Sequence, residues 1–182
     1  PTPTATVTAD ASYCTGVIVP VTPPMLTPVG ANFSWTNSNT AIGLAASGSG
    51  VVPSFTTTNS ASGTISGIIS VTPTANGCMG TAATYTLTVY PVPTVSVPVS
   101  AAYCTGATVP SGVLTGNPAG VSFAWTNSNT SMGLAASGTG NIPGFTAVNT
   151  GSTPVSGTIT VTPTANGCTG NAVTYTITVN PL

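Results

Sequence analysis

Strict alternation of apolar and polar residues marks the clearest strand in the sequence, residues 84–90. One face of this segment carries Tyr85, Leu87 and Val89, as expected for a half-buried strand. An upstream segment shows the same period of two and places on one face Ile65, Gly67, Ile69 and Val71. Turn-forming residues at 73–77 separate the two segments, so we predict an antiparallel hairpin there.

Shorter alternating segments at 4–8, 17–21 and 31–35 predict further strands. No stretch has the length and period of a helix. The best one, residues 44–46, is flanked by Gly43 and Gly48, which favours a turn or a short strand. Six to eight short strands per ninety residues fit an all-β fold of the immunoglobulin-like sandwich type.

The sequence repeats itself at an offset of 90 residues without a gap. Three segments show this most clearly: residues 13–16 recur at 103–106, 35–40 at 125–130, and 71–78 at 161–168. We therefore expect two tandem β-sandwich modules, 1–91 and 92–182. Both ends of the chain have the phase of the linker at 91–93, which suggests that similar modules precede and follow it. The Pro-Val-Pro linker favours a stiff spacer, and hence a rod-like array.

Side chains for acid–base chemistry are almost absent, because the chain has no Lys, Arg or His and one acidic residue, Asp10. A catalytic triad, a carboxylate pair and a Schiff-base lysine all need residues that are missing. Calcium needs several carboxylates and zinc needs clustered Cys or His. We expect no enzyme activity, no cofactor and no metal site.

The same composition argues against two classes of partner. Nucleic acids and anionic lipids are bound largely through Lys and Arg, so neither is expected as a partner. No apolar run approaches the roughly 20 residues of a membrane helix. With 41% hydrophobic residues at regular intervals, the chain should form ordered domains.

Each module holds two cysteines: Cys14 and Cys78 in the first, Cys104 and Cys168 in the second. Four cysteines permit three pairings. Symmetry favours Cys14–Cys78 and Cys104–Cys168, which would repeat identically and clamp one end of each sandwich; the alternative is four small buried thiols. Under tension, such a clamp would leave about 26 of 90 residues extensible, or roughly 90 Å instead of 315 Å. A disulfide would also indicate an oxidising compartment outside the cytoplasm.

A Trp-Thr-Asn-Ser-Asn-Thr motif follows the central strand of each module and supplies the candidate ligand-contact residues. These are Trp35, Asn37, Asn39, Trp125, Asn127 and Asn129. An exposed indole could stack on a sugar ring, whereas a buried one would belong to the core. The asparagines could bind hydroxyl groups, but such residues more often form Asx turns at strand ends.

These motifs, together with the Tyr-Cys-Thr-Gly start and the Val-Thr-Pro-Thr-Ala-Asn-Gly-Cys segment, resemble the PKD-like and Ig-like repeats of very large secreted Bacteroidota proteins, including gliding-motility adhesins. The resemblance covers both modules. It implies export to the cell surface, by the type IX route, and it brings no catalytic residues.

Two hypotheses for function follow. The first is a structural segment of a long extracellular surface filament or adhesin stalk, disulfide-clamped and joined to neighbouring copies of the module. Lateral self-association into a fibre is part of it, because edge strands without charges are unprotected. The alternative is a carbohydrate- or surface-binding Ig-like module of a larger secreted protein, with glycans as partners.

Overall fold

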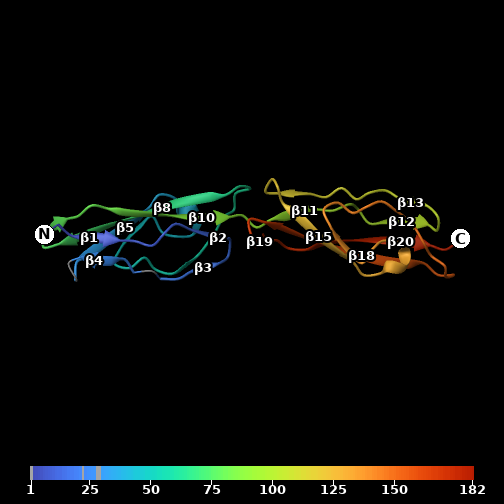
Figure 1. Cartoon of the computed structure of the whole chain (residues 1–182), viewed down its shortest axis with the longest axis horizontal. Coiled ribbons are helices and arrows are strands. Elements are labelled where there is room, and N and C mark those ends of the chain that lie inside the picture. Colours follow the sequence, from blue (N-terminus) through green and yellow to red (C-terminus); the bar gives the residue numbers. More distant parts are fainter. Residues whose placement is uncertain (1, 22, 28–29) are drawn as a thin grey trace. The chain divides into compact units, whose positions relative to one another are not determined.

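The structure, a computed structural model, describes residues 2–21, 23–27 and 30–182. The chain divides into two compact units, Pro1–Pro91 and Val92–Leu182, which we call module 1 and module 2. Each is a β-sandwich of short strands, and the two modules have the same strand order (Figure 1).

The secondary structure repeats element by element. Module 1 contains β1 (Thr4–Thr6), β2 (Ala11–Cys14), β3 (Ile18–Val19), β4 (Met25–Thr27), β5 (Asn32–Asn37), the 3-10 turn η1 (Thr40–Ile42), β6 (Ser47–Ser49), β7 (Phe55–Thr56), β8 (Ile65–Ala75), β9 (Cys78–Met79) and β10 (Ala83–Tyr90). Module 2 contains β11 (Thr94–Ser96), β12 (Ala101–Cys104), β13 (Thr108–Val109), β14 (Thr115–Asn117), β15 (Ser122–Asn127), η2 (Thr130–Met132), β16 (Ser137–Thr139), β17 (Phe145–Thr146), β18 (Val155–Ala165), β19 (Cys168–Thr169) and β20 (Val173–Asn180).

The larger sheet of module 1 has the order β2-β10-β8-β5-β6, and β9 pairs with the far end of β8. All pairs are antiparallel except β2 and β10, which run parallel. The two short pairs β1–β4 and β3–β7 form the opposing layer. The chain therefore changes layer between β1 and β2. Figure 1 shows β1 and β4 toward one end of the module and β2 and β3 toward the other.

The strands predicted from alternation are confirmed. In β10, Leu87 and Val89 are buried, and in β8, Ile69 and Val71 are buried. The turn after β8 is shorter than predicted, because Pro73–Ala75 continue the strand and only two residues, Asn76 and Gly77, turn the chain into β9. Both have positive φ, 51° and 76°, as a tight Asn-Gly hairpin turn requires.

The number of strands exceeds the predicted six to eight, since module 2 alone has ten. The additional ones are pieces of two or three residues. They arise where the first strand is divided by its change of layer and where a short β9-type strand follows the Asn-Gly turn. Residues 44–46 form a bend and not a strand.

The core of module 1 lies between the two layers and is built around Trp35, which is 4% exposed. Its other buried members are Ile42, Leu44, Val52, Ile69, Val71, Leu87 and Val89. Gly48, opposite Trp35 in the β5–β6 pair, leaves room for the indole, because a Cβ at this position would overlap the ring. Gly138 and Trp125 repeat the arrangement in module 2.

We predict that Gly48→Ala lowers the unfolding free energy of module 1 by about 2 kcal/mol, because the added methyl group forces the indole out of its rotamer. Urea unfolding followed by Trp35 fluorescence, in a Trp125→Phe background, measures this. Gly63→Ala is the matched control: nothing lies within 4 Å of its Cβ position, so stability should change by less than about 0.5 kcal/mol. Equal effects of the two substitutions would contradict the packing argument.

Candidate functional site

The first and last strands of the larger sheet are paired with each other in each module. β2 pairs parallel with β10 in the register Leu87↔Ala11 to Tyr90↔Cys14. In module 2, β12 pairs with β20 in the same way. Because neighbouring parallel strands point in one direction, the chain enters β2 at one end of the pair and leaves β10 at the other. We call the β2–β10 pair, and its β12–β20 equivalent, the terminal clamp.

Side chains extend the terminal clamp at both ends. Before β2, the Asp10 carboxylate accepts a hydrogen bond of 2.7 Å from the Thr86 backbone N–H. After β2, the Thr15 N–H and hydroxyl both donate to the Tyr90 carbonyl, at 3.1 and 2.9 Å. The one acidic residue of the chain therefore has a structural role. Ser100 replaces it in module 2, where its hydroxyl accepts from the Thr176 N–H at 2.9 Å.

The Tyr-Cys-Thr-Gly motif forms the carboxy-terminal end of this clamp. Cys14 is the last residue of β2, Thr15 bonds to Tyr90, and Gly16 turns the chain with a φ of 87°. The buried Thr57 hydroxyl donates to the Cys14 carbonyl at 2.7 Å, and the Val17 N–H donates to the same hydroxyl at 3.0 Å. The backbone around Cys14 is thus fixed from both sides.

The predicted disulfide pairing is wrong. Cys14 and Cys168 are disulfide-bonded, but Cys78 and Cys104 are exposed free thiols, so neither Cys14–Cys78 nor Cys104–Cys168 forms. The reason is distance along the module. Cys14 lies beside Tyr90, next to the start of β8, whereas Cys78 pairs with Ala75 at its end.

The ten residue steps of β8 between those ends span about 33 Å, whereas a disulfide joins Cα atoms roughly 5.5 Å apart. Module 2 has the same separation, since Cys104 lies beside Asn180 and Cys168 pairs with Ala165. In each module, therefore, one cysteine marks the end where the chain leaves and the other the end where it begins.

The candidate ligand-contact residues are mostly buried. Trp35 and Trp125 are core residues, each 4% exposed, and Asn37 and Asn127 are 7% and 8% exposed. The Asn37 amide donates to the carbonyls of Asn39 and Leu44 at 3.0 and 2.9 Å. Its side-chain oxygen accepts from the Asn39 N–H at 3.0 Å. This is the predicted Asx turn, and the indoles have no face open to a sugar ring.

Asn39 is half-buried and its amide is also committed within the module. Its oxygen accepts from the Ala41 N–H at 3.1 Å and caps η1, and its nitrogen donates to the Ser66 carbonyl at 3.0 Å. Asn129 makes the equivalent bonds to Ser131 and Ser156. These asparagines therefore join the loop to β8 and β18, and ligand contact would break those bonds.

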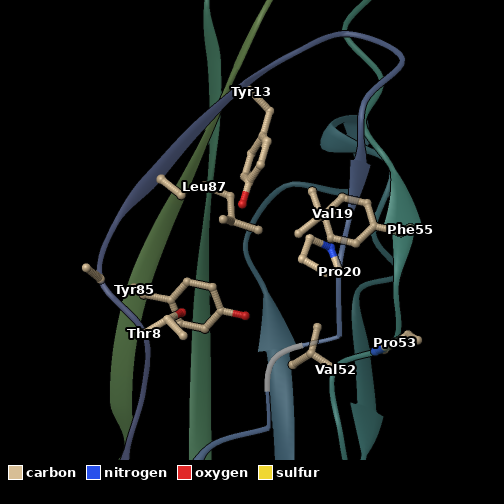
Figure 2. A pocket seen from close by; sticks show the side chains of 11 residues that line it. Thr8, Tyr13, Val19, Pro20, Val52, Pro53, Phe55, Tyr85 and Leu87 are labelled. Carbon is tan, nitrogen blue, oxygen red and sulfur yellow. The ribbon is translucent and has the colours of Figure 1, made fainter.

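The open side of each sandwich, between the terminal clamp and the opposing layer, contains a small cavity. In module 1 it has a volume of about 120 Å³. Figure 2 shows Tyr13 and Tyr85 projecting from one wall and Val19, Pro20 and Phe55 from the opposite wall. The equivalent cavity in module 2, lined by Tyr103 and Tyr175, measures about 80 Å³. Both are well below the roughly 300 Å³ of small ligand sites.

Among the described residues, no group of three or more His, Cys, Asp or Glu lies close enough to bind a metal. Within the same ranges, no helix is sufficiently long and apolar to cross a membrane.

Comparison with known proteins gives a consistent result. The PKD-like domain model matches residues 98–182. Similar solved structures include mouse cadherin-23 EC22–24, with 9% identity, a TM-score of 0.51, and coverage of 100% of this chain and 67% of that one. Protocadherin gammaB7 EC3-6, solved as a cis-dimer, shows 14% identity, a TM-score of 0.50, and coverage of 100% and 48%. The tandem Ig repeats of Dlar show 11% identity, a TM-score of 0.36, and coverage of 100% and 99%.

The chain has the fold of two tandem immunoglobulin-like β-sandwiches. It spans about half the length of the protocadherin chain that it matches, and no curated protein sequence matches it. Module 2 is matched by the PKD-like model over nearly its whole length, and module 1 shares its strand order and its 90-residue register.

Sequence reasoning missed the terminal clamp, because parallel pairing of the first and last strands of the larger sheet leaves no local pattern. Two signals were available. Asp10 and Ser100 occupy equivalent positions just before β2 and β12, where a short acceptor side chain suits a capping role. The Tyr-Cys-Thr-Gly motif could also have been read as a strand end followed by a glycine turn.

Alkaline pH should destabilise both modules through the cavity tyrosines. Burial raises the pKa of Tyr85 above 10.0, and the neighbouring Tyr13 raises it further; Tyr175 and Tyr103 repeat this. The folded state therefore favours the neutral phenol, so this contribution to stability is present below pH 10 and is lost as pH rises through the higher folded-state pKa. Urea midpoints measured from pH 8 to pH 11 should fall above pH 10.

Tyr85→Phe with Tyr175→Phe should remove most of that decline, because neither folded nor unfolded chain can then ionise at these positions. An identical decline in the double variant would show that other groups cause it.

Proposed function

We propose that the chain is a structural segment of a long extracellular filament or adhesin stalk, built from repeated immunoglobulin-like modules and located at a cell surface. The observation that carries this proposal is the terminal clamp. The clamp determines how a module responds when it is pulled by the two segments that connect it to its neighbours.

Tension on a module acts on β2 and β10 in opposite directions. The chain reaches β2 from the amino-terminal side, and β10 continues into the linker at Pro91 on the carboxy-terminal side. Parallel neighbours pulled this way slide along each other, so their hydrogen bonds are loaded together and not one at a time. Forced unfolding depends on the rate of this step, and a sheared pair resists it better than one that is peeled apart.

The side-chain bonds described above lengthen the sheared segment. Asp10 and Thr15 add contacts beyond each end of the four-residue β2, and Ser100 and Thr105 do so for β12. The two modules thus share these contacts, although one of them is made by Asp10 in module 1 and by Ser100 in module 2. A role in bearing tension accounts for that, whereas a ligand site would be expected at exposed polar groups.

The edge strands of the larger sheet are where modules could associate laterally. They are β2, with four residues, and β6, with three. Short edge strands are themselves a protection against edge-to-edge pairing, so the lack of charge is partly offset. The proposed function therefore rests on end-to-end connection and not on lateral packing.

Thr15→Val tests the proposal in the chain with its disulfide reduced, pulled by its ends at constant force. Loss of the hydroxyl bond to Tyr90, worth about 1 kcal/mol, should raise the unfolding rate of module 1 about fivefold. Module 2 serves as the internal reference.

Thr58→Val is the matched control, because its hydroxyl makes a bond of similar length, 2.7 Å to the Ala41 carbonyl, outside the clamp. It should leave the unfolding rate under load nearly unchanged. If both variants accelerate unfolding equally, or if module 1 opens without measurable resistance, the stalk proposal fails.

A further inference from the structure

The cavity on the open side of module 1 lies where the chain changes layer between β1 and β2. The crossing segment, with Thr8 and Ala9, forms part of its lining. Two strand edges lie on either side of the opening. β2 is the edge strand of the larger sheet, and β3 pairs with β7 alone among the described strands. The cavity therefore opens between two strand edges, an arrangement that suits an extended chain.

Two phenol hydroxyl groups point into this cavity. Figure 2 shows those of Tyr13 and Tyr85 directed into the space between the two walls. Within the part of the chain that the structure describes, neither hydroxyl has a hydrogen-bond partner. Tyr103 and Tyr175 line the module 2 cavity in the same way, although Tyr175 is only 6% exposed. Removing a hydroxyl from bulk water without giving it a partner costs free energy, so these groups favour a ligand that accepts from them.

The cavity residues on β2 and β3 recur in module 2, whereas their exposed neighbours do not. Eight positions line both cavities at the 90-residue offset, and five carry the same residue in both: Ala11, Tyr13, Val19, Pro20 and Tyr85. The exposed residues of β2 and β3, Ser12 and Ile18, are replaced by Ala102 and Thr108. Phenylalanine would fill the space as well as tyrosine does, so packing alone does not account for a hydroxyl at all four tyrosine positions.

The size and the walls of the cavity suit one small apolar ring. Val19, Pro20 and Phe55 form the wall opposite the two tyrosines. A cavity of roughly 150 Å³ accepts a benzene ring, so the volume of about 120 Å³ matches the five-membered ring of a proline. Among the described lining residues, only Thr8 and the tyrosines have polar side chains, whereas an oligosaccharide needs several polar groups and a larger site.

The hydrogen-bond donors in the cavity also match a proline-rich segment. Each phenol can donate one hydrogen bond. A proline-rich segment offers carbonyl groups but few N–H groups, and its polyproline II conformation leaves the carbonyls free of internal bonds. Grooves lined by aromatic residues bind such segments in other kinds of domain. The cavity combines donors with apolar walls and has no charged group, which makes it complementary to an uncharged partner rich in acceptors.

We propose that the cavity of module 1 binds an extended proline-rich segment of a partner protein. One proline ring occupies the space between Phe55 and the two tyrosines. The Tyr13 and Tyr85 hydroxyls donate to carbonyl groups on either side of that ring. The module 2 cavity, at about 80 Å³, binds the same kind of segment more weakly, because a ring fits it less well. This binding does not depend on the proposed load-bearing role.

Titration of the ¹⁵N-labelled chain with an oligoproline peptide, blocked at both ends, tests the proposal. Backbone amide signals in two-dimensional NMR spectra report on each module separately. We expect the signals of β2, β3 and residues 52–55 to shift first, and those of the module 2 cavity at higher peptide concentration. Because the peptide is uncharged, added salt should leave its affinity nearly unchanged. A Gly-Ser peptide of equal length is the control and should cause no shifts.

Two pairs of variants locate the binding site. Tyr85→Phe removes one donor and should weaken binding about fivefold, whereas Tyr90→Phe removes a hydroxyl that does not line the cavity and should have no effect. Ala11→Leu fills the cavity and should abolish binding at module 1 alone. Ser12→Leu adds the same side chain on the exposed face of β2 and should leave binding intact. The spectra show whether module 1 is folded; if Ala11→Leu unfolds it, the tyrosine pair decides.

Three results would overturn the proposal: no shifts with oligoproline, equal shifts with the Gly-Ser peptide, or an unchanged affinity of Tyr85→Phe. Titration with a glucan oligosaccharide provides a fourth, because shifts at the cavity with the glucan and not with oligoproline would assign the site to carbohydrate. None of these results affects the clamp test of the stalk proposal.

Discussion

The parallel pairing of β2 with β10 is the constraint on which the rest of the structure depends. It brings the first strand of the larger sheet beside the last one, so each module begins at one end and finishes at the other. β1 pairs with β4 in the opposing layer, so the chain has to cross to the other layer before β2 can pair with β10. The same pairing determines where the cysteines lie, because Cys14 ends β2 while Cys78 follows the distant end of β8.

The modules achieve this order almost without charge. Where other proteins use ion pairs, amide side chains connect the loops to the strands. Asn37 bonds to its own loop, and Asn59 donates to the carbonyls of Gly63 and Val89 at 2.9 and 2.8 Å. Buried amides that satisfy both donors and acceptors specify a single loop conformation. The hydrogen bonds within each loop offset the cost of desolvating these amides. The surface then carries mainly hydroxyl and amide groups, and salt should scarcely affect the stability of the modules.

The local alternation of apolar and polar residues predicted the fold well, whereas the disulfide pairing was predicted poorly. The alternation in β8 and β10, the 90-residue repeat and the core position of Trp35 all follow from side-chain period and burial. The pairing of cysteines depends on which ends of strands are neighbours, and that is decided by a contact between residues about 75 positions apart, such as Thr15 with Tyr90. Symmetry misled because the two modules differ in which cysteine is bonded: it is the first one, Cys14, in module 1 and the second one, Cys168, in module 2.

The central claim is that the parallel β2–β10 pair resists tension on module 1 because its hydrogen bonds are sheared together. The most direct measurement compares two pulling geometries of the reduced chain. In the first, module 1 is pulled from residues 1 and 91; in the second, it is pulled from residues 15 and 90, which lie side by side at one end of the pair. The account predicts a higher unfolding force in the first geometry, where the strands slide, than in the second, where they peel apart. Equal forces in the two geometries would contradict the account.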